Sequence, residues 1–135
     1  MRIKYKVVKE ASITDLITLY KEADWWDEKN DDPSFLTELV RKTYCFVGAF
    51  DNSRMIGMGR SISDSVSDAY IQDVTVLKKY RNQGIGGQII NTLINYLLEN
   101  NIKWIGLIGE PGTESFYKQL SFKKMQNYIP MIYKN

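Results

Sequence analysis

A glycine-rich turn carries the strongest chemical signal in this sequence of 135 residues. Residues 80–90 read YRNQGIGGQII, so Arg81, Gly84, Gly86 and Gly87 share a short polar stretch that leads into a helical apolar pattern. A helix N-terminus exposes unpaired N–H groups, and glycines without a Cβ let phosphate oxygens approach those groups closely. Arg81 adds a positive charge at the edge of the turn. The turn is therefore predicted to hold a phosphate-bearing ligand.

Two familiar phosphate motifs do not explain this turn. The run GIGGQI lacks the last glycine of the G-x-G-x-x-G dinucleotide pattern, and no Lys-Ser or Lys-Thr pair follows as in a P-loop. The glycines could instead serve only to tighten a strand-to-helix turn. The basic residues Lys78, Lys79 and Arg81 favour a ligand, because they lead directly into the turn and would attract a small anion.

The composition narrows the chemistry that the chain can perform. It contains no histidine and one cysteine, which excludes Ser-His and Cys-His catalytic pairs and predicts that no metal is bound. Cys45 lies in an apolar run and is interpreted as a buried small hydrophobic residue. The net charge of +2 is too small to predict nucleic-acid binding. No apolar run has membrane-spanning length and no signal peptide is evident, so a cytoplasmic protein is predicted.

Hydrophobic periodicity predicts a single α/β (α+β) domain over residues 1–135. The predicted order is βααβββαβαββ, which places antiparallel strands first and a parallel βαβ unit after them. The glycine turn lies between a strand rich in β-branched residues and the longest helix. The expected strands span residues 2–9, 44–50, 55–63, 70–77 and 102–109, the helices 12–23, 33–43, 85–100 and 112–120, and two final strands lie within 122–135.

Two motifs in the second half of the chain resemble those of a known family. DVTVLKKYRNQGIGGQII closely resembles the acetyl-CoA-binding motif of the GNAT superfamily of N-acetyltransferases, with Arg81, Gly84 and Gly86 at the fixed places of its Arg/Gln-x-x-Gly-x-Gly/Ala signature. ESFYKQLSF resembles the Phe-Tyr-x-x-x-Gly-Phe helix of that family, with Ser121 where glycine is usual. The motifs span residues 70–122, and the first half resembles the family in its element order alone.

The resemblance implies a GNAT-like fold with a mixed, mostly antiparallel sheet of about six to seven strands and about four helices. It also implies that acetyl-CoA is the co-substrate, with its pantetheine arm beside the backbone of Val74 and Val76. The Val74 N–H would face the oxygen on which negative charge develops. In this interpretation the pyrophosphate lies on the N–H groups of Asn82, Gln83, Gly84, Ile85, Gly86 and Gly87, with Arg81 beside them.

For catalysis, the resemblance implies that a primary amine attacks the thioester directly in a ternary complex. Tyr117 matches the tyrosine that protonates the departing thiolate, although it could instead only pack as its neighbour Phe116 does. No general base is assigned. Asp73 and Glu110 are the nearest acidic candidates, and a water chain is an alternative. The loop acids Asp24, Asp27 and Glu28 are further candidates, and Tyr70 stands where the family often has a catalytic glutamate.

Trp25 and Trp26 lie in the segment that walls the acceptor site in this fold. Two tryptophans among acidic residues would suit a cationic amine, on a small molecule or on a protein, although they could instead form a lid packed on the core. Two other functions stay open: an acyl-CoA-binding sensor or partner domain without turnover, and a transferase of another acyl group. No nucleic-acid or membrane partner is expected, and a homodimer is left open.

Overall fold

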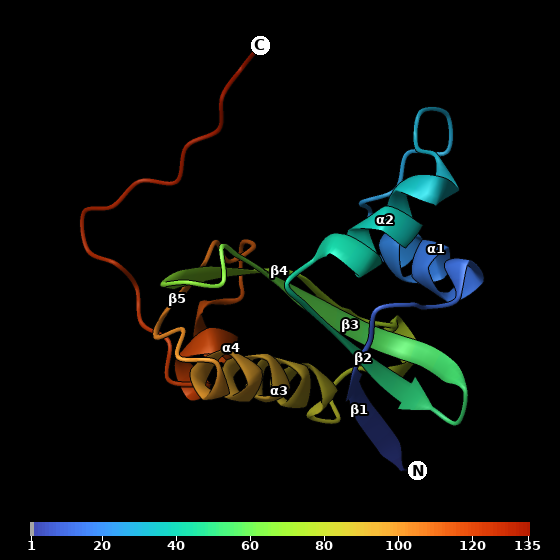
Figure 1. Ribbon diagram of the computed structural model, residues 1–135, viewed down its shortest axis with the longest axis horizontal. Coiled ribbons are helices and arrows are strands. Elements are labelled where there is room, and N and C mark those ends of the chain that lie inside the picture. Colours follow the sequence, from blue (N-terminus) through green and yellow to red (C-terminus); the bar gives the residue numbers. More distant parts are fainter. Residues whose placement is uncertain (1) are drawn as a thin grey trace.

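A mixed five-stranded sheet forms the centre of the molecule in the computed structural model, which describes residues 2–135 (Figure 1). The strands follow one another in sequence order across the sheet. β1 to β4 pair in antiparallel fashion, and β5 joins β4 in parallel. The strands are β1 (Ile3–Val7), β2 (Cys45–Asp51), β3 (Arg54–Ser63), β4 (Asp68–Val76) and β5 (Trp104–Leu107).

Helices cover both faces of this sheet. Helices α1 (Ile13–Glu22) and α2 (Pro33–Lys42) lie on one face, and α3 (Ile85–Glu99) and α4 (Glu114–Gln119) lie on the other (Figure 1). A short 3-10 turn, η1 (Lys78–Tyr80), precedes the glycine turn. The first two helices begin where the sequence supplies capping side chains, because Ser12 accepts from the Asp15 N–H and Asp32 accepts from the Ser34 N–H.

The core lies between the sheet and both helical layers. Residues 45–49 of β2 are buried in succession, as expected for a strand that is covered on both faces. Helix α3 buries Ile89, Ile90 and Leu93 completely against the sheet. Cys45 is fully buried as well, and its burial raises the pKa of the thiol to about 11. This confirms the interpretation of Cys45 as a small hydrophobic core residue.

The predicted fold class is confirmed, but the expected number of six to seven strands was too high. Residues 123–135 form no helix or strand, although two final strands were expected within 122–135. The segment is rich in residues that favour strands, yet such residues form a strand only when another strand pairs with them. Within residues 2–135, no helix combines the length and the apolar character needed to cross a bilayer.

Candidate active site

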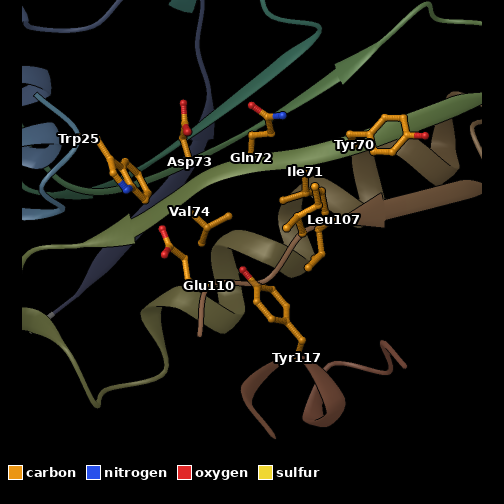
Figure 2. A pocket seen from close by; sticks show the side chains of 10 residues that line it. Trp25, Tyr70, Ile71, Gln72, Asp73, Val74, Leu107, Glu110 and Tyr117 are labelled. Atoms are coloured by element: carbon orange, nitrogen blue, oxygen red, sulfur yellow. The ribbon is translucent and has the colours of Figure 1, made fainter. Parts of the chain in front are cut away.

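Strand β4 contains a bulge at its centre. The pairs Met58–Thr75 and Arg60–Gln72 leave only Gly59 opposite both Asp73 and Val74. Asp73 adopts a left-handed backbone with φ of 55°, which non-glycine residues rarely adopt. A bulge bends the strand and redirects its backbone groups locally. The side chains of Asp73 and Val74 point to opposite sides of β4, and both border the same pocket (Figure 2).

A hydrogen-bonded clamp holds the bulge from the face that carries α1 and α2. Oδ2 of Asp73 accepts from the Tyr20 hydroxyl at 2.8 Å and from Nε of Arg60 at 2.7 Å. Arg60 also donates through Nη1 to Oγ1 of Thr43 at 3.2 Å. Burial and then the charge of Asp73 raise the pKa of Tyr20, so its hydroxyl remains a donor. The carboxylate of Asp73 is therefore engaged by Tyr20 and Arg60, which makes Asp73 a poor candidate for the general base.

Strands β4 and β5 separate just before the bulge. Their parallel pairing runs from Asp68–Trp104 to Ile71–Leu107. After that pair β4 stays paired with β3, but within residues 2–135 no strand pairs with its other edge. A pocket of about 260 Å³ opens at this separation (Figure 2). Its lining consists of residues 70–74 of β4, Leu107, Ile108, Glu110, Tyr117 and Trp25.

Tyr117 extends from α4 toward the pocket, with its hydroxyl directed to the side on which Glu110 lies (Figure 2). Phe116 and Phe122 pack edge-on against its ring, at centroid distances of 4.9 and 5.7 Å. Burial raises the pKa of Tyr117, and the charge of Glu110 raises it further. The phenol therefore keeps its proton at neutral pH and can donate it into the pocket. Tyr117 both packs against its aromatic neighbours and lines the pocket. The interpretation as a packing residue and the interpretation as a proton donor therefore do not exclude each other.

The glycine turn lies at the N-terminus of α3, after the end of β4. Gly84 caps the helix with φ of 81°, and a Cβ built on it would meet no atom within 4 Å. The first intrahelical bond runs from the Gln88 N–H to the Gly84 carbonyl, so the three preceding N–H groups have no partner within the helix. A Cβ on Gly86 would lie 3.3 Å from the Phe116 ring. Gly84 therefore leaves open space over the helix end, whereas Gly86 allows α3 and α4 to pack closely.

Arg81 folds back along the strand that precedes the turn. Its Nε donates to the Val76 carbonyl at 2.8 Å, which ties the turn to the end of β4. Asn82, with φ of 62°, and Gln83 are exposed at the surface of the turn. The side chain of Val76 is buried and that of Val74 is half-buried, so their backbone groups alone are available to a ligand along β4.

Only one of the two predicted acceptor tryptophans lines the pocket. Trp25 borders it and packs edge-on against Tyr20 at 5.9 Å. Both tryptophans pack against the core, but Trp26 does not belong to the pocket lining. Two of the loop acids are engaged locally: Glu28 pairs with Lys21, and Asp27 accepts from the Lys29 N–H and the Asn30 side chain. None of the three loop acids lines the pocket. Glu110 is an exposed carboxylate that lines the pocket and forms none of the salt bridges found within residues 2–135.

Sequence reasoning missed the clamp around Asp73. Arg60 and Tyr20 come from β3 and α1, and no local pattern indicates that either side chain reaches β4. It also missed Gln72 and Leu107 in the pocket lining. Among residues 2–135, no group of three or more His, Cys, Asp or Glu side chains is arranged to hold a metal ion.

A profile of the acetyltransferase (GNAT) family matches residues 10–122. The chain belongs to this family. Named relatives include the "uncharacterized N-acetyltransferase ycf52" of Pyropia yezoensis, 38% identical over 73 residues, which are 54% of this chain and 42% of that protein. The histone acetyltransferase TAP1 of Glycine max is 37% identical over 84 residues, which are 62% of this chain and 36% of that protein. The matches thus span less than half of these relatives.

Solved structures of the family share this fold. A GNAT family acetyltransferase from Streptococcus pneumoniae superposes with a TM-score of 0.79 and covers 99% of this chain and 98% of its own. Its sequence identity is 24%, so the likeness shows the fold alone. The GNAT-like fold that the two sequence motifs predicted is therefore confirmed over nearly the whole chain.

Proposed function

We propose that residues 1–135 act as one N-acetyltransferase domain that moves an acetyl group from acetyl-CoA to a primary amine while both are bound. One observation carries the proposal. The pairing of β4 and β5 stops at Ile71–Leu107 and leaves a pocket bordered by Val74 and Tyr117. A slot in the sheet beside a helix N-terminus suits a long ligand that has a phosphate group in its middle and a reactive group at its end.

The residues around the turn fit the coenzyme. The N–H groups of Ile85, Gly86 and Gly87 lack helical partners and would bind the pyrophosphate, with Asn82, Gln83 and Gly84 around them. Open space over Gly84 supports this assignment, since a Cβ there would meet nothing within 4 Å. The free edge of β4 offers the backbone of Val74 and Val76 to the pantetheine arm.

Three groups of the chain would perform the chemistry, and bound acetyl-CoA supplies an activated acetyl carbonyl beside them. The Val74 N–H donates a hydrogen bond toward the oxygen on which negative charge develops. Tyr117 donates its proton toward the departing sulfur and regains one from solvent. Glu110 accepts the proton that the amine must lose, directly or through a water molecule. Because Asp73 is bound by Arg60 and Tyr20, Glu110 is the better-placed carboxylate for this role.

The lining also supports a cationic acceptor. Trp25 offers an aromatic face and Glu110 a negative charge, which together attract an ammonium group before it is deprotonated. One relative is named a histone acetyltransferase, so lysine-containing peptides belong among the acceptors to test alongside small amines. Trp26 lies outside the pocket lining, and we assign the acceptor contact to Trp25. A cytoplasmic location stays a prediction.

Mass spectrometry of the purified protein with acetyl-CoA and a panel of amines and lysine peptides tests the proposal. We expect a mass increase of one acetyl group on at least one acceptor and expect succinyl-CoA to give less product, since the pocket is small. The Tyr117→Phe protein is the matched control for uncatalysed transfer. Coenzyme binding without turnover of any acceptor would favour the sensor, and the absence of binding would refute the proposal.

A further inference from the structure

A second crevice of the domain carries charged side chains that the proposed chemistry does not use. It lies between the segment that joins β1 to α1 and one face of α2, and its volume is about 290 Å³. Its lining consists of Lys9, Glu10, Ala11, Thr37, Val40 and Arg41, none of which borders the pocket at β4 and β5. Ligand pockets commonly have volumes of about 300–1,000 Å³, so this crevice suits a small molecule.

Helical spacing brings one side of the crevice together. Thr37, Val40 and Arg41 are three and four positions apart and therefore share one face of α2. Val40 is 1% exposed and supplies an apolar floor, whereas Thr37 and Arg41 are exposed beside it. The joining segment supplies Lys9 and Glu10, whose side chains are exposed as well. The crevice thus combines an apolar floor with charged groups on two elements.

The charged groups of the crevice are only partly engaged within the chain. Nζ of Lys9 donates to the Thr43 carbonyl at 3.0 Å, which uses one of its three hydrogens. Nη2 of Arg41 lies 3.8 Å from Oε1 of Glu38, and both side chains are about 60% exposed, so this pair is loose. Glu10 forms none of the salt bridges found within residues 2–135. Two cations and one carboxylate are therefore left to meet a ligand.

We propose that this crevice binds a free amino acid with two carboxylates, such as glutamate. One carboxylate accepts from the ammonium group of Lys9, the other accepts from the guanidinium of Arg41, and the amino group of the ligand donates to Glu10. The hydrocarbon part of the ligand lies on Val40. The net charge of the two cations and one carboxylate of the lining is balanced by the net charge of such an amino acid at neutral pH. An amino acid with one carboxylate would leave a cation unmatched, and a dicarboxylate without an amino group would leave Glu10 unmatched.

A chain of hydrogen bonds joins this crevice to the clamp at Asp73. The carbonyl of Thr43 accepts from Lys9, and its hydroxyl accepts from Nη1 of Arg60 at 3.2 Å. Arg60 in turn donates to Asp73 through Nε. A ligand that holds Lys9 and Arg41 would restrain Thr43, which is 7% exposed, and with it the clamp. This effect on the pocket rests on the proposed function, whereas binding in the crevice does not.

A nuclear magnetic resonance titration of the full chain with glutamate tests the site and requires neither acetyl-CoA nor turnover. We expect the amide signals of residues 9–11 and 37–41 to shift in a saturable way. Glutarate, which lacks the amino group, and glutamine, which lacks one carboxylate, should each bind about fivefold more weakly or worse. Glu10→Gln should remove the advantage of glutamate over glutarate.

Two neighbouring cations of α2 give a matched pair of variants. Arg41→Glu should weaken glutamate binding by about tenfold or more, because it replaces the guanidinium by a repelling charge. Lys42→Glu makes a similar change of charge one residue further along, on a side chain that is 70% exposed and outside the lining, and should change the affinity by about twofold at most. Glu110→Gln should leave the affinity unchanged, since Glu110 belongs to the other pocket.

Three results would overturn the proposal: no saturable shifts at millimolar glutamate, shifts confined to residues 70–74 and 107–117, or equal weakening by Arg41→Glu and Lys42→Glu. Glutarate binding as tightly as glutamate would overturn the assignment of an amino acid.

The link to the clamp is tested in the acetyltransferase assay with another amine as acceptor. Glutamate that fills the crevice should raise kcat/KM by about twofold or more, because it favours the clamped bulge. Thr43→Val keeps the carbonyl that binds Lys9 and removes the hydroxyl that binds Arg60, so it should abolish this rise while the affinity for glutamate is retained. An unchanged kcat/KM in the parent at saturating glutamate would overturn the link. Absence of turnover would instead refute the proposed function, and the titration would still decide whether the crevice binds glutamate.

Discussion

Substitutions at Asp73 separate two properties of this residue, its left-handed backbone and its clamped carboxylate. Asp73→Asn keeps one carbonyl acceptor and tolerates a φ of 55°, but removes the charge that binds Arg60. Asp73→Gly removes every side-chain contact and leaves the backbone relaxed. Asp73→Ala removes the same contacts and also strains the backbone. We therefore expect the loss of stability to increase in the order asparagine, glycine, alanine.

The burial of the pair sets the size of these losses. The side chains of Arg60 and Asp73 are 14% and 23% exposed, which places them between a surface ion pair and a fully buried one. Breaking the first kind costs about 0–1 kcal/mol and the second about 3–5 kcal/mol. We expect about 2 kcal/mol for asparagine and about 3 kcal/mol for glycine, which also loses the hydrogen bond from Tyr20. Alanine adds a left-handed residue at about 1–2 kcal/mol, for a total of about 4 kcal/mol.

Urea unfolding measures these differences through the shift of the transition midpoint at an unchanged slope. In a double-mutant cycle, Arg60→Met should cost clearly less in the Asp73→Asn protein than in the parent, because the charge pair is already broken. Turnover should fall by about tenfold or more in Asp73→Gly, since the bulge orients the Val74 N–H. Coenzyme affinity should change less than turnover, because none of the hydrogen bonds of the clamp involves the glycine turn, where the pyrophosphate is proposed to bind.

Two outcomes would refute this reasoning. If Asp73→Ala unfolds within about 0.5 kcal/mol of the parent, the clamp contributes nothing measurable to stability. If alanine and glycine cost the same, the left-handed backbone at this position carries no strain. Full turnover in a folded Asp73→Gly protein would show that the clamp is not needed to orient the Val74 N–H.

Three further predictions concern the turn, the acid and the thiol. Gln83→Glu adds a charge to the exposed turn and should reduce the rise in melting temperature with coenzyme A, whereas Asn95→Asp, further along α3, should not; equal effects would argue against the turn as the phosphate site. Tyr117→Phe should lower kcat by about a hundredfold with little change in coenzyme affinity, and activity within about twofold of the parent would remove the acid role. Because burial and then the charge of Glu110 raise the pKa of Tyr117, the loss of the protonated donor should set in at higher pH than for an ordinary tyrosine, which a pH-rate profile checks. With its pKa raised to about 11, Cys45 should react with a thiol reagent at pH 8 only after unfolding by urea, and rapid reaction of the native protein would contradict its burial.

Much of the local structure follows from residues close together in the sequence. The turn at residues 80–90 could be predicted because helix ends and glycine conformations depend on immediate neighbours. The four helices were expected for the same reason, and Ser12 and Asp32 cap the first two. The position of Tyr117 on α4 followed from the Phe-Tyr motif, and its direction into the pocket agrees with that interpretation. Its catalytic role stays a prediction.

Strand pairing was less accessible to sequence analysis, as the segment after Phe122 shows. Its β-branched and aromatic residues predicted two strands, yet residues 123–135 form none within one chain. Strand propensity expresses a fit to neighbouring strands, so it cannot determine where a strand finds its partner.

Only the tertiary structure decided how the pocket is built. The bulge at Asp73 and Val74 depends on the register with β3, and the clamp that holds it joins Tyr20 and Asp73 across 53 positions of the chain. Trp25 and Trp26 are adjacent in sequence and both pack against the core, but only Trp25 also lines the pocket. Contacts of this kind depend on how distant elements meet when they bury apolar surface, and a local pattern carries no record of that arrangement.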